Sequence, residues 1–237
     1  MQIRLFTIPN FVTLGNLLCG CGASVAALVY GDFTAALWLL VAAAVFDFAD
    51  GATARLLKQY SELGVQLDSL ADMISFGFTP AAILFAVSAD APSAFGLDAA
   101  WVAVFRFAVF VVAAFSALRL AKFNIDDTQH EEFCGLPTPA CAMFCASLGM
   151  LCATGRLSLP REALTAAAVV MAALLVSPIR MFSLKFRNLS LRENALRYIF
   201  VLLCVAAIFF ARAYALVAII VMYVAISSVR WIAQRGR

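Results

Sequence analysis

The stretch DFADGATARLLKQYSELGVQLDSLAD, residues 47–72, carries four aspartates between two long apolar runs. Asp47 and Asp50 are three residues apart, and Asp68 and Asp72 are four apart. Each pair therefore lies on one face if its segment is helical. A polar segment between the pairs allows the chain to reverse direction. Two neighbouring antiparallel helices would then direct four carboxylates into one volume.

Composition predicts that these helices cross a membrane. Of the 237 residues, 65% are hydrophobic and 13% are charged, and the mean hydropathy is +0.97. A soluble domain is about half apolar and about a quarter charged. We therefore expect an all-α polytopic membrane protein, with one integral membrane domain over residues 1–237. The seven cysteines have no paired CxxC spacing, so we expect apolar packing from them rather than disulfides or metal ligands.

Long apolar runs set the expected number of helices. A bilayer core needs roughly 20 apolar residues per helix. On this criterion we expect eight transmembrane helices, near residues 10–30, 33–58, 66–89, 99–123, 136–154, 160–178, 194–211 and 213–233. The last two are predicted to form a hairpin, because together they are about twice as long as one crossing. The start of the chain lacks a signal-peptide layout, so we expect no cleaved leader.

The basic residues predict the orientation in the membrane. If the N-terminus is cytoplasmic, all but four of the 17 Lys and Arg residues fall on the cytoplasmic side. The four exceptions are Arg106, Arg156, Arg161 and Arg212. We therefore expect a protein of the cell membrane with both termini in the cytoplasm and the aspartates near the cytoplasmic surface. The net charge of +3 comes from scattered residues, so no nucleic-acid partner is expected.

Four carboxylates at one place require a counter-charge. An unpaired carboxylate within a membrane costs at least ~2.5 kcal/mol, and four together repel one another. One or two divalent cations would remove both penalties. Because the expected ligands are hard oxygens without nearby histidine or cysteine, the pattern favours Mg²⁺, Mn²⁺ or Ca²⁺ over zinc.

Small residues and one arginine lie between the aspartate pairs. Gly51 and its small neighbours leave room for a ligand against the backbone, although they also suit helix packing. Arg55 lies one turn after Gly51 and can pair with a phosphate, although it also suits a purely topogenic role. Metal ions together with an arginine at the cytoplasmic surface indicate phosphoryl chemistry.

The complete spacing from Asp47 to Asp72 reads D-x2-D-G-x2-A-R-x8-G-x3-D-x3-D. It resembles the signature of the CDP-alcohol phosphatidyltransferases at every fixed position. Four further stretches are similar to the branch of membrane-embedded phosphatidylserine synthases: IPNFVTLGNLLCG (8–20), LDSLADMISFGFTPA (67–81), LRLAKFN (118–124) and GLPTPA (135–140). The resemblance covers about the first 140 residues.

The resemblance implies an all-helical membrane enzyme that forms a homodimer. Its core would have six helices, to which this branch adds two at the C-terminus. It would transfer the phosphatidyl group of CDP-diacylglycerol to the hydroxyl of L-serine, giving phosphatidylserine and CMP. Two Mg²⁺ or Mn²⁺ ions would occupy each site.

The resemblance also implies roles for particular residues. The metal ligands would be Asp47, Asp50, Asp68 and Asp72, and Asp72 would also accept the proton of the serine hydroxyl. The CDP moiety or its diphosphate would contact Asn10, Thr13, Gly51, Arg55 and Ser61. Asn10 and Thr13 also suit helix capping, and a loop serine such as Ser61 often serves only in a turn. The candidates for binding serine are Arg119, Lys122 and Arg180, which also suit topogenic or headgroup-binding roles.

Two alternatives for the chemistry follow from single residues. Soluble-type phosphatidyltransferases use an HxKx4D nucleophile, but the residue two positions after His130 is Glu132, so a single displacement is expected. The acidic residues of the same loop, Asp126, Asp127, Glu131 and Glu132, suit either the serine ammonium or a solvated loop.

Other functions fit the aspartate motif. The acceptor could be glycerol 3-phosphate or an inositol phosphate, or the donor an archaeal-type lipid, since only the flanking stretches separate these enzymes. A cation transporter is the alternative from another class. Clustering of the aspartates at one membrane face, without a broken-helix repeat, argues against it.

Overall fold

The computed structural model describes residues 5–96, 98–125, 133–182 and 194–235. Its elements, in chain order, are α1 (Ile8–Leu28), α2 (Phe33–Leu56), α3 (Glu62–Asp72), the π-helix η1 (Met73–Phe78), α4 (Thr79–Val87), α5 (Ala99–Ala108), α6 (Val111–Ile125), β1 (Phe133–Cys134), α7 (Thr138–Ala153), α8 (Arg161–Leu175), β2 (Arg180–Met181), α9 (Ala195–Ala211), the 3₁₀ turn η2 (Arg212–Tyr214) and α10 (Ala215–Arg235). The prediction of an all-α membrane protein is confirmed.

Within the described residues, five helical stretches are long and apolar enough to cross a membrane. They are Ile8–Leu28, Phe33–Leu56, Glu62–Val87, Ala99–Ile125 and Ala195–Gln234. Helix is also present at the two other predicted spans, in the shorter α7 and α8. The last of the five stretches holds both α9 and α10, which are separated by η2 and pack against each other. This arrangement agrees with the predicted hairpin, whereas eight complete crossings stay a prediction.

Polar side chains set the starts of the first three helices. The Thr7 hydroxyl caps α1 by accepting a hydrogen bond from the Asn10 amide (3.4 Å), and Asp32 caps α2 through the Ala35 amide (2.8 Å). Ser61 caps α3 in the same way through the Gly64 amide (3.0 Å). Such caps satisfy amides that have no partner within the helix. The Ser61 cap explains why the third helix begins at residue 62 rather than at the predicted 66.

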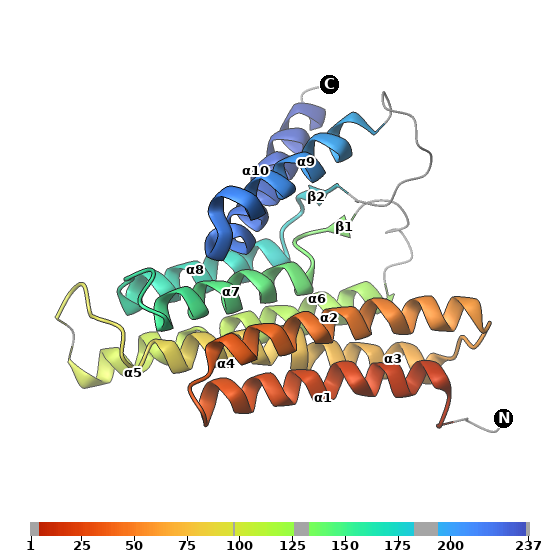
Figure 1. Ribbon diagram of the computed structural model, residues 1–237, viewed down its shortest axis with the longest axis horizontal. Coiled ribbons are helices and arrows are strands. Elements are labelled where there is room, and N and C mark those ends of the chain that lie inside the picture. Colours follow the sequence, from red (N-terminus) through yellow and green to blue (C-terminus); the bar gives the residue numbers. More distant parts are fainter. Residues whose placement is uncertain (1–4, 97, 126–132, 183–193, 236–237) are drawn as a thin grey trace.

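The helices form layers that bring distant segments to one end of the bundle (Figure 1). The helices α1 to α6 lie together, α7 and α8 cover them, and the α9–α10 hairpin packs through α10 on α7. The start of α1, the end of α2, the start of α3 and the end of α6 all lie at the same end, on the right of Figure 1. The strands β1 and β2 pair antiparallel and tie the segment before α7 to the one after α8.

A very close contact joins α1 to η1. A Cβ placed on Gly20 would lie 2.6 Å from the Ser75 Cα, so only glycine fits at this crossing. The Thr79 hydroxyl lies 3.0 Å from the carbonyl of Gly20 and 2.8 Å from the Ser24 hydroxyl. These contacts hold the π turn against α1, immediately after Asp72.

Two predicted helices differ in detail from the structure. The span predicted at 66–89 contains the π-helix η1. This π-helix packs against both α1 and α6, which periodicity along the sequence does not reveal. The span predicted at 99–123 is divided into α5 and α6 by a turn at residues 109–110. Phe107, just before this turn, and Phe110, within it, both pack on Phe85 of α4.

Candidate active site

The last turns of α2 and the first turns of α3 bring three carboxylates together. One oxygen each from Asp47, Asp50 and Asp68 lies within 4.8 Å of the others. Asp50 is buried, Asp47 and Asp68 are half-buried, and the buried Oδ1 of Asp68 has no hydrogen-bond partner among the described residues. Hard oxygens at this separation, with an unpaired lone-pair donor, fit a divalent cation. The cluster could therefore hold a metal ion.

The fourth aspartate occupies a different environment. Asp72 is buried, with 8% of its surface exposed, and lies one turn after Asp68. It is outside the group of three oxygens described above. The Asn16 side-chain amide donates a hydrogen bond to the Asp72 Oδ1 over 2.9 Å. The structure thus separates one oriented carboxylate from the three that cluster.

Helix α1 supplies a second contact to the carboxylates through Thr13. Its hydroxyl lies 2.6 Å from the Asp50 Oδ2 and 3.1 Å from the carbonyl of Pro9. A hydroxyl has one proton to donate, and the shorter contact leads to the charged acceptor. Thr13 therefore orients Asp50 in addition to any contact it makes with a ligand.

A pocket of about 140 Å³ opens beside this cluster. Its lining comes from the start of α1, the end of α2, the following turn and the start of α3, and consists of Pro9, Asn10, Thr13, Asp50, Gly51, Ala54, Gln59, Tyr60, Ser61, Gly64, Val65 and Asp68. Four of the five residues assigned to CDP from the resemblance line this pocket. Gln59 and Tyr60 also line the pocket but were not predicted from the sequence. Their position next to Ser61, in the turn between the aspartate pairs, was the signal that could have identified them.

Glycines bring the walls of the pocket close together. A Cβ on Gly64 would lie 3.1 Å from the Ser61 Oγ and 3.5 Å from the Asn10 Oδ1, so α3 packs tightly against the start of α1. The fifth CDP candidate, Arg55, is exposed and does not line the pocket. Its Nη1 lies 3.5 Å from the position of a Cβ on Gly51, so the guanidinium is beside the glycine wall.

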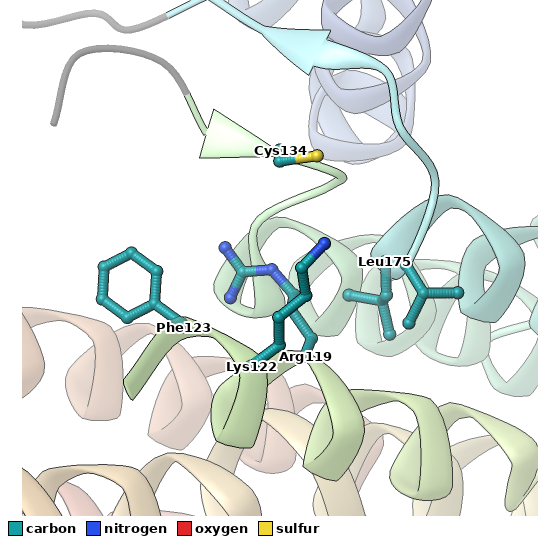
Figure 2. Close-up of a pocket in the computed structure, with 6 residues that line it drawn as sticks. Arg119, Lys122, Phe123, Cys134 and Leu175 are labelled. Carbon is teal, nitrogen blue, oxygen red and sulfur yellow. The ribbon is translucent and has the colours of Figure 1, made fainter. Parts of the chain in front are cut away.

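A second, smaller pocket lies between α6, β1 and the end of α8. It has a volume of about 20 Å³ and is lined by Arg119, Lys122, Phe123, Cys134, Leu175 and Val176. In Figure 2 the side chains of Arg119 and Lys122 rise from α6 toward the segment that carries Cys134. Arg119 donates to the Thr138 hydroxyl (3.2 Å), and its buried Nε has no partner among the described residues.

Arg119 and Lys122, the first two serine candidates, both line this small pocket. The third serine candidate, Arg180, lies in β2 opposite Cys134. It is exposed and does not line either pocket. The structure therefore brings Arg119 and Lys122 together and leaves Arg180 at the edge. The loop residues Asp126, Asp127, His130, Glu131 and Glu132 lie outside the described residues.

Known proteins resemble this chain in sequence over the part that carries the site. The family model described as CDP-alcohol phosphatidyltransferase matches residues 6–179. A Mycobacterium tuberculosis protein named CDP-diacylglycerol–serine O-phosphatidyltransferase is 38% identical over 156 residues, which are 63% of this chain and 50% of that protein. Proteins of the same name from Helicobacter pylori and Bacillus subtilis are 35% and 32% identical, over 59% and 57% of this chain and 55% and 71% of their own lengths. The chain thus spans about half the length of the mycobacterial relative.

Proposed function

This chain belongs to the CDP-alcohol phosphatidyltransferase family, and on that premise we propose that it transfers the phosphatidyl group of CDP-diacylglycerol to L-serine. The products are phosphatidylserine and CMP, and the reaction is a step of phospholipid synthesis. The names of the three relatives support serine as the acceptor. The observation that carries the proposal is the pocket in which the nucleotide candidates of α1, α2 and α3 adjoin the carboxylate cluster.

The nucleotide-linked donor occupies the larger pocket in this proposal. The cytidine and its phosphates lie against Asn10, Gly51 and Ser61, which line that pocket. The Ser61 hydroxyl accepts from the Gly64 amide, and its own proton is free to be donated to a phosphate oxygen. Arg55, beside Gly51, adds a positive charge at the diphosphate. The acyl chains extend from this site into the bilayer.

Asp72 takes the proton from the serine hydroxyl. The serine oxygen then forms a bond to the phosphorus of the phosphatidyl group, while the bond from that phosphorus to the CMP oxygen breaks and CMP leaves with the electron pair. The proton stays on Asp72 until it passes to solvent. Burial and the hydrogen bond from Asn16 hold this carboxylate in one orientation, and such positioning is a large part of catalysis.

Two divalent ions, Mg²⁺ or Mn²⁺, complete the proposed site, held by Asp47, Asp50, Asp68 and Asp72. When bound, they would neutralise the diphosphate and the charge that develops on the departing CMP. Thr13 fixes Asp50 for this purpose through its 2.6 Å hydrogen bond. Without cations the clustered carboxylates repel one another, so metal binding also supports the local fold.

We propose that the smaller pocket binds the serine carboxylate through Arg119 and Lys122, with Arg180 contributing from the edge. Arg119 and Lys122 line this pocket, and basic side chains pair with carboxylates.

The location proposed for the protein is the cell membrane, with the aspartate end of the bundle and both termini facing the cytoplasm. The distribution of basic residues supports this orientation. We also propose that residues 1–237 form one membrane domain and that the protein is a homodimer, as the family resemblance implies. Native mass spectrometry from detergent would detect the dimer mass.

An acceptor panel tests the proposed reaction. Purified protein in detergent is supplied with Mn²⁺ and CDP-diacylglycerol, and CMP release is measured with L-serine, glycerol 3-phosphate, an inositol phosphate or no acceptor. We expect CMP and phosphatidylserine to appear in equal amounts with serine and only with metal present. Release with glycerol 3-phosphate or the inositol phosphate but not with serine would assign the chain to another branch. No release with any acceptor would contradict the proposed activity.

A further inference from the structure

Asn16 reaches the aspartate site from α1, although it was not among the predicted site residues. It is fully buried, at 0% exposure, and lies three residues after Thr13, on the same face of the helix. Its side-chain Nδ2 donates to the Asp72 Oδ1 over 2.9 Å. Because an ionised carboxylate only accepts hydrogen bonds, the amide must turn its nitrogen toward Asp72. Its oxygen is then free to meet a donor other than Asp72.

The Asn16 Oδ1 has no hydrogen-bond partner among the described residues. The large majority of buried side-chain polar atoms have a hydrogen-bond partner, and an exception needs an explanation such as a bound water, an ion or a catalytic role. The neighbouring turn of α1 offers no internal donor, since the Thr13 hydroxyl is already directed at Asp50 and Pro9. The unpaired oxygen therefore indicates a place for a hydrogen-bond donor from outside the chain.

Other unpaired polar atoms lie on α6, which packs against η1, the segment immediately after Asp72. Among the described residues, the buried Nε of Arg119 and the buried hydroxyl of Ser116, one turn earlier, have no hydrogen-bond partner. Ser116 lies beside Gly77 of η1. Two helices that pack against η1, α1 and α6, thus both carry open polar groups, as the binding of a small polar molecule would require.

We propose that the Asn16 Oδ1 accepts a hydrogen bond from the ammonium group of the acceptor amino acid, while the Nδ2 of the same residue holds Asp72. The inference rests on the proposed function, which gives partners to the carboxylate and the hydroxyl of serine but none to its ammonium group. The carboxylate of serine pairs with Arg119 on α6, its hydroxyl faces Asp72, and its ammonium faces Asn16 on α1. Asn16 therefore selects acceptors that carry an amine.

Two acceptors that differ by the ammonium group test this role. L-serine and 3-hydroxypropionate both carry a hydroxyl and a carboxylate, and only serine has the amine. We expect the ratio of kcat/KM for serine to that for 3-hydroxypropionate to fall about 10- to 100-fold in Asn16→Ala, as for the loss of one hydrogen bond to a charged group. The ratio does not depend on the fraction of folded enzyme. A general loss of Asp72 positioning lowers both rates and cancels in the ratio.

A matched control comes from the same helix. Ser24 is a buried polar residue of α1 that hydrogen-bonds to Thr79, away from Asp72, and Ser24→Ala should leave the ratio unchanged. If Asn16→Ala lowers kcat/KM equally for both acceptors, Asn16 only positions Asp72 and the proposal is wrong. If Ser116→Ala changes the ratio and Asn16→Ala does not, the ammonium lies at Ser116 and the proposal is also wrong.

A binding measurement decides the question if Asn16→Ala has too little turnover. The unfolding temperature is followed with Mn²⁺ and CMP present, with and without each acceptor. We expect L-serine to raise the unfolding temperature of the wild type more than 3-hydroxypropionate does, and this difference to vanish in Asn16→Ala. A difference that persists in the variant would overturn the proposal. Absence of serine-dependent CMP release in the wild type is a separate result, which counts against the proposed function itself.

Discussion

At the scale of single residues, the structure places the acidic groups in two environments. Asp47, Asp50 and Asp68 share one small volume, where ionised carboxylates repel one another unless a cation or a proton lies between them. Asp72 is outside this group and accepts a hydrogen bond from the Asn16 amide. In the proposed reaction this difference would allow Asp72 to act as the base beside the metal ligands.

The separation predicts different effects for two asparagine variants. Asp72→Asn should lower kcat about 10²- to 10⁴-fold, the usual range for loss of a general base. Its effect on Mn²⁺ affinity should be smaller than that of Asp50→Asn, because Asp50 belongs to the group of three oxygens and Asp72 does not. CMP release and calorimetric titration with Mn²⁺ measure the two effects. Full turnover in Asp72→Asn would rule out the proposed proton transfer.

Thr13 gives a second test at this scale. Thr13→Val keeps the shape of the side chain but removes the donor to Asp50. A hydrogen bond to a charged group contributes ~1.5–3 kcal/mol, so we expect Mn²⁺ affinity or kcat/KM to fall about 10- to 100-fold. Thr13→Ser retains the hydroxyl and should stay within a few-fold of the wild type. Equal losses in both variants would show that the methyl group, rather than the hydrogen bond, is important.

At the scale of helices, the sequence was sufficient to place most elements but not their irregularities. Runs of about 20 apolar residues predict membrane helices directly, and each predicted span contains helix. The π turn at 73–78 was missed because it depends on contacts from other helices, including the Thr79 hydroxyl against Gly20. Asn16 was missed for a similar reason, because only the fold brings it to Asp72. The polar spacing Asn10, Thr13, Asn16 on an apolar helix was the available signal.

The crossing of α1 and η1 predicts that replacing a glycine of α1 by alanine changes stability by very different amounts at Gly20 and at Gly22. Gly20→Ala should destabilise the protein by about 1–3 kcal/mol, as expected for overpacking, because the new Cβ would lie 2.6 Å from the backbone of Ser75. Gly22→Ala on the same helix meets only the Leu39 side chain at 3.5 Å and gains the same helix propensity. Thermal unfolding in detergent compares the two. Similar unfolding temperatures would show that η1 does not pack as closely as described.

At the scale of the whole molecule, the fold gathers the chemistry at one end of the bundle. The start of α1, the ends of α2 and α6 and the start of α3 meet there (Figure 1). A phosphorylated nucleotide is water-soluble while acyl chains are not, so a site at the end of a membrane bundle can bind both parts of one donor. The α7–α8 connection lies at the opposite end of the bundle, and it should therefore face the other side of the membrane.

Reporter fusions test this orientation. Alkaline phosphatase inserted at Gly155, in the exposed α7–α8 turn, should be active in a bacterial host because it reaches the periplasm. Green fluorescent protein fused after Arg237 should fluoresce because that end stays in the cytoplasm. The physical reason is that, in the predicted topology, all Lys and Arg residues except Arg106, Arg156, Arg161 and Arg212 fall on the cytoplasmic side. An inactive phosphatase at Gly155 together with a non-fluorescent C-terminal fusion would show that the orientation is the reverse of the predicted one. Such a result would place the aspartate cluster on the periplasmic face, away from the cytoplasmic nucleotide pool that the proposed reaction requires.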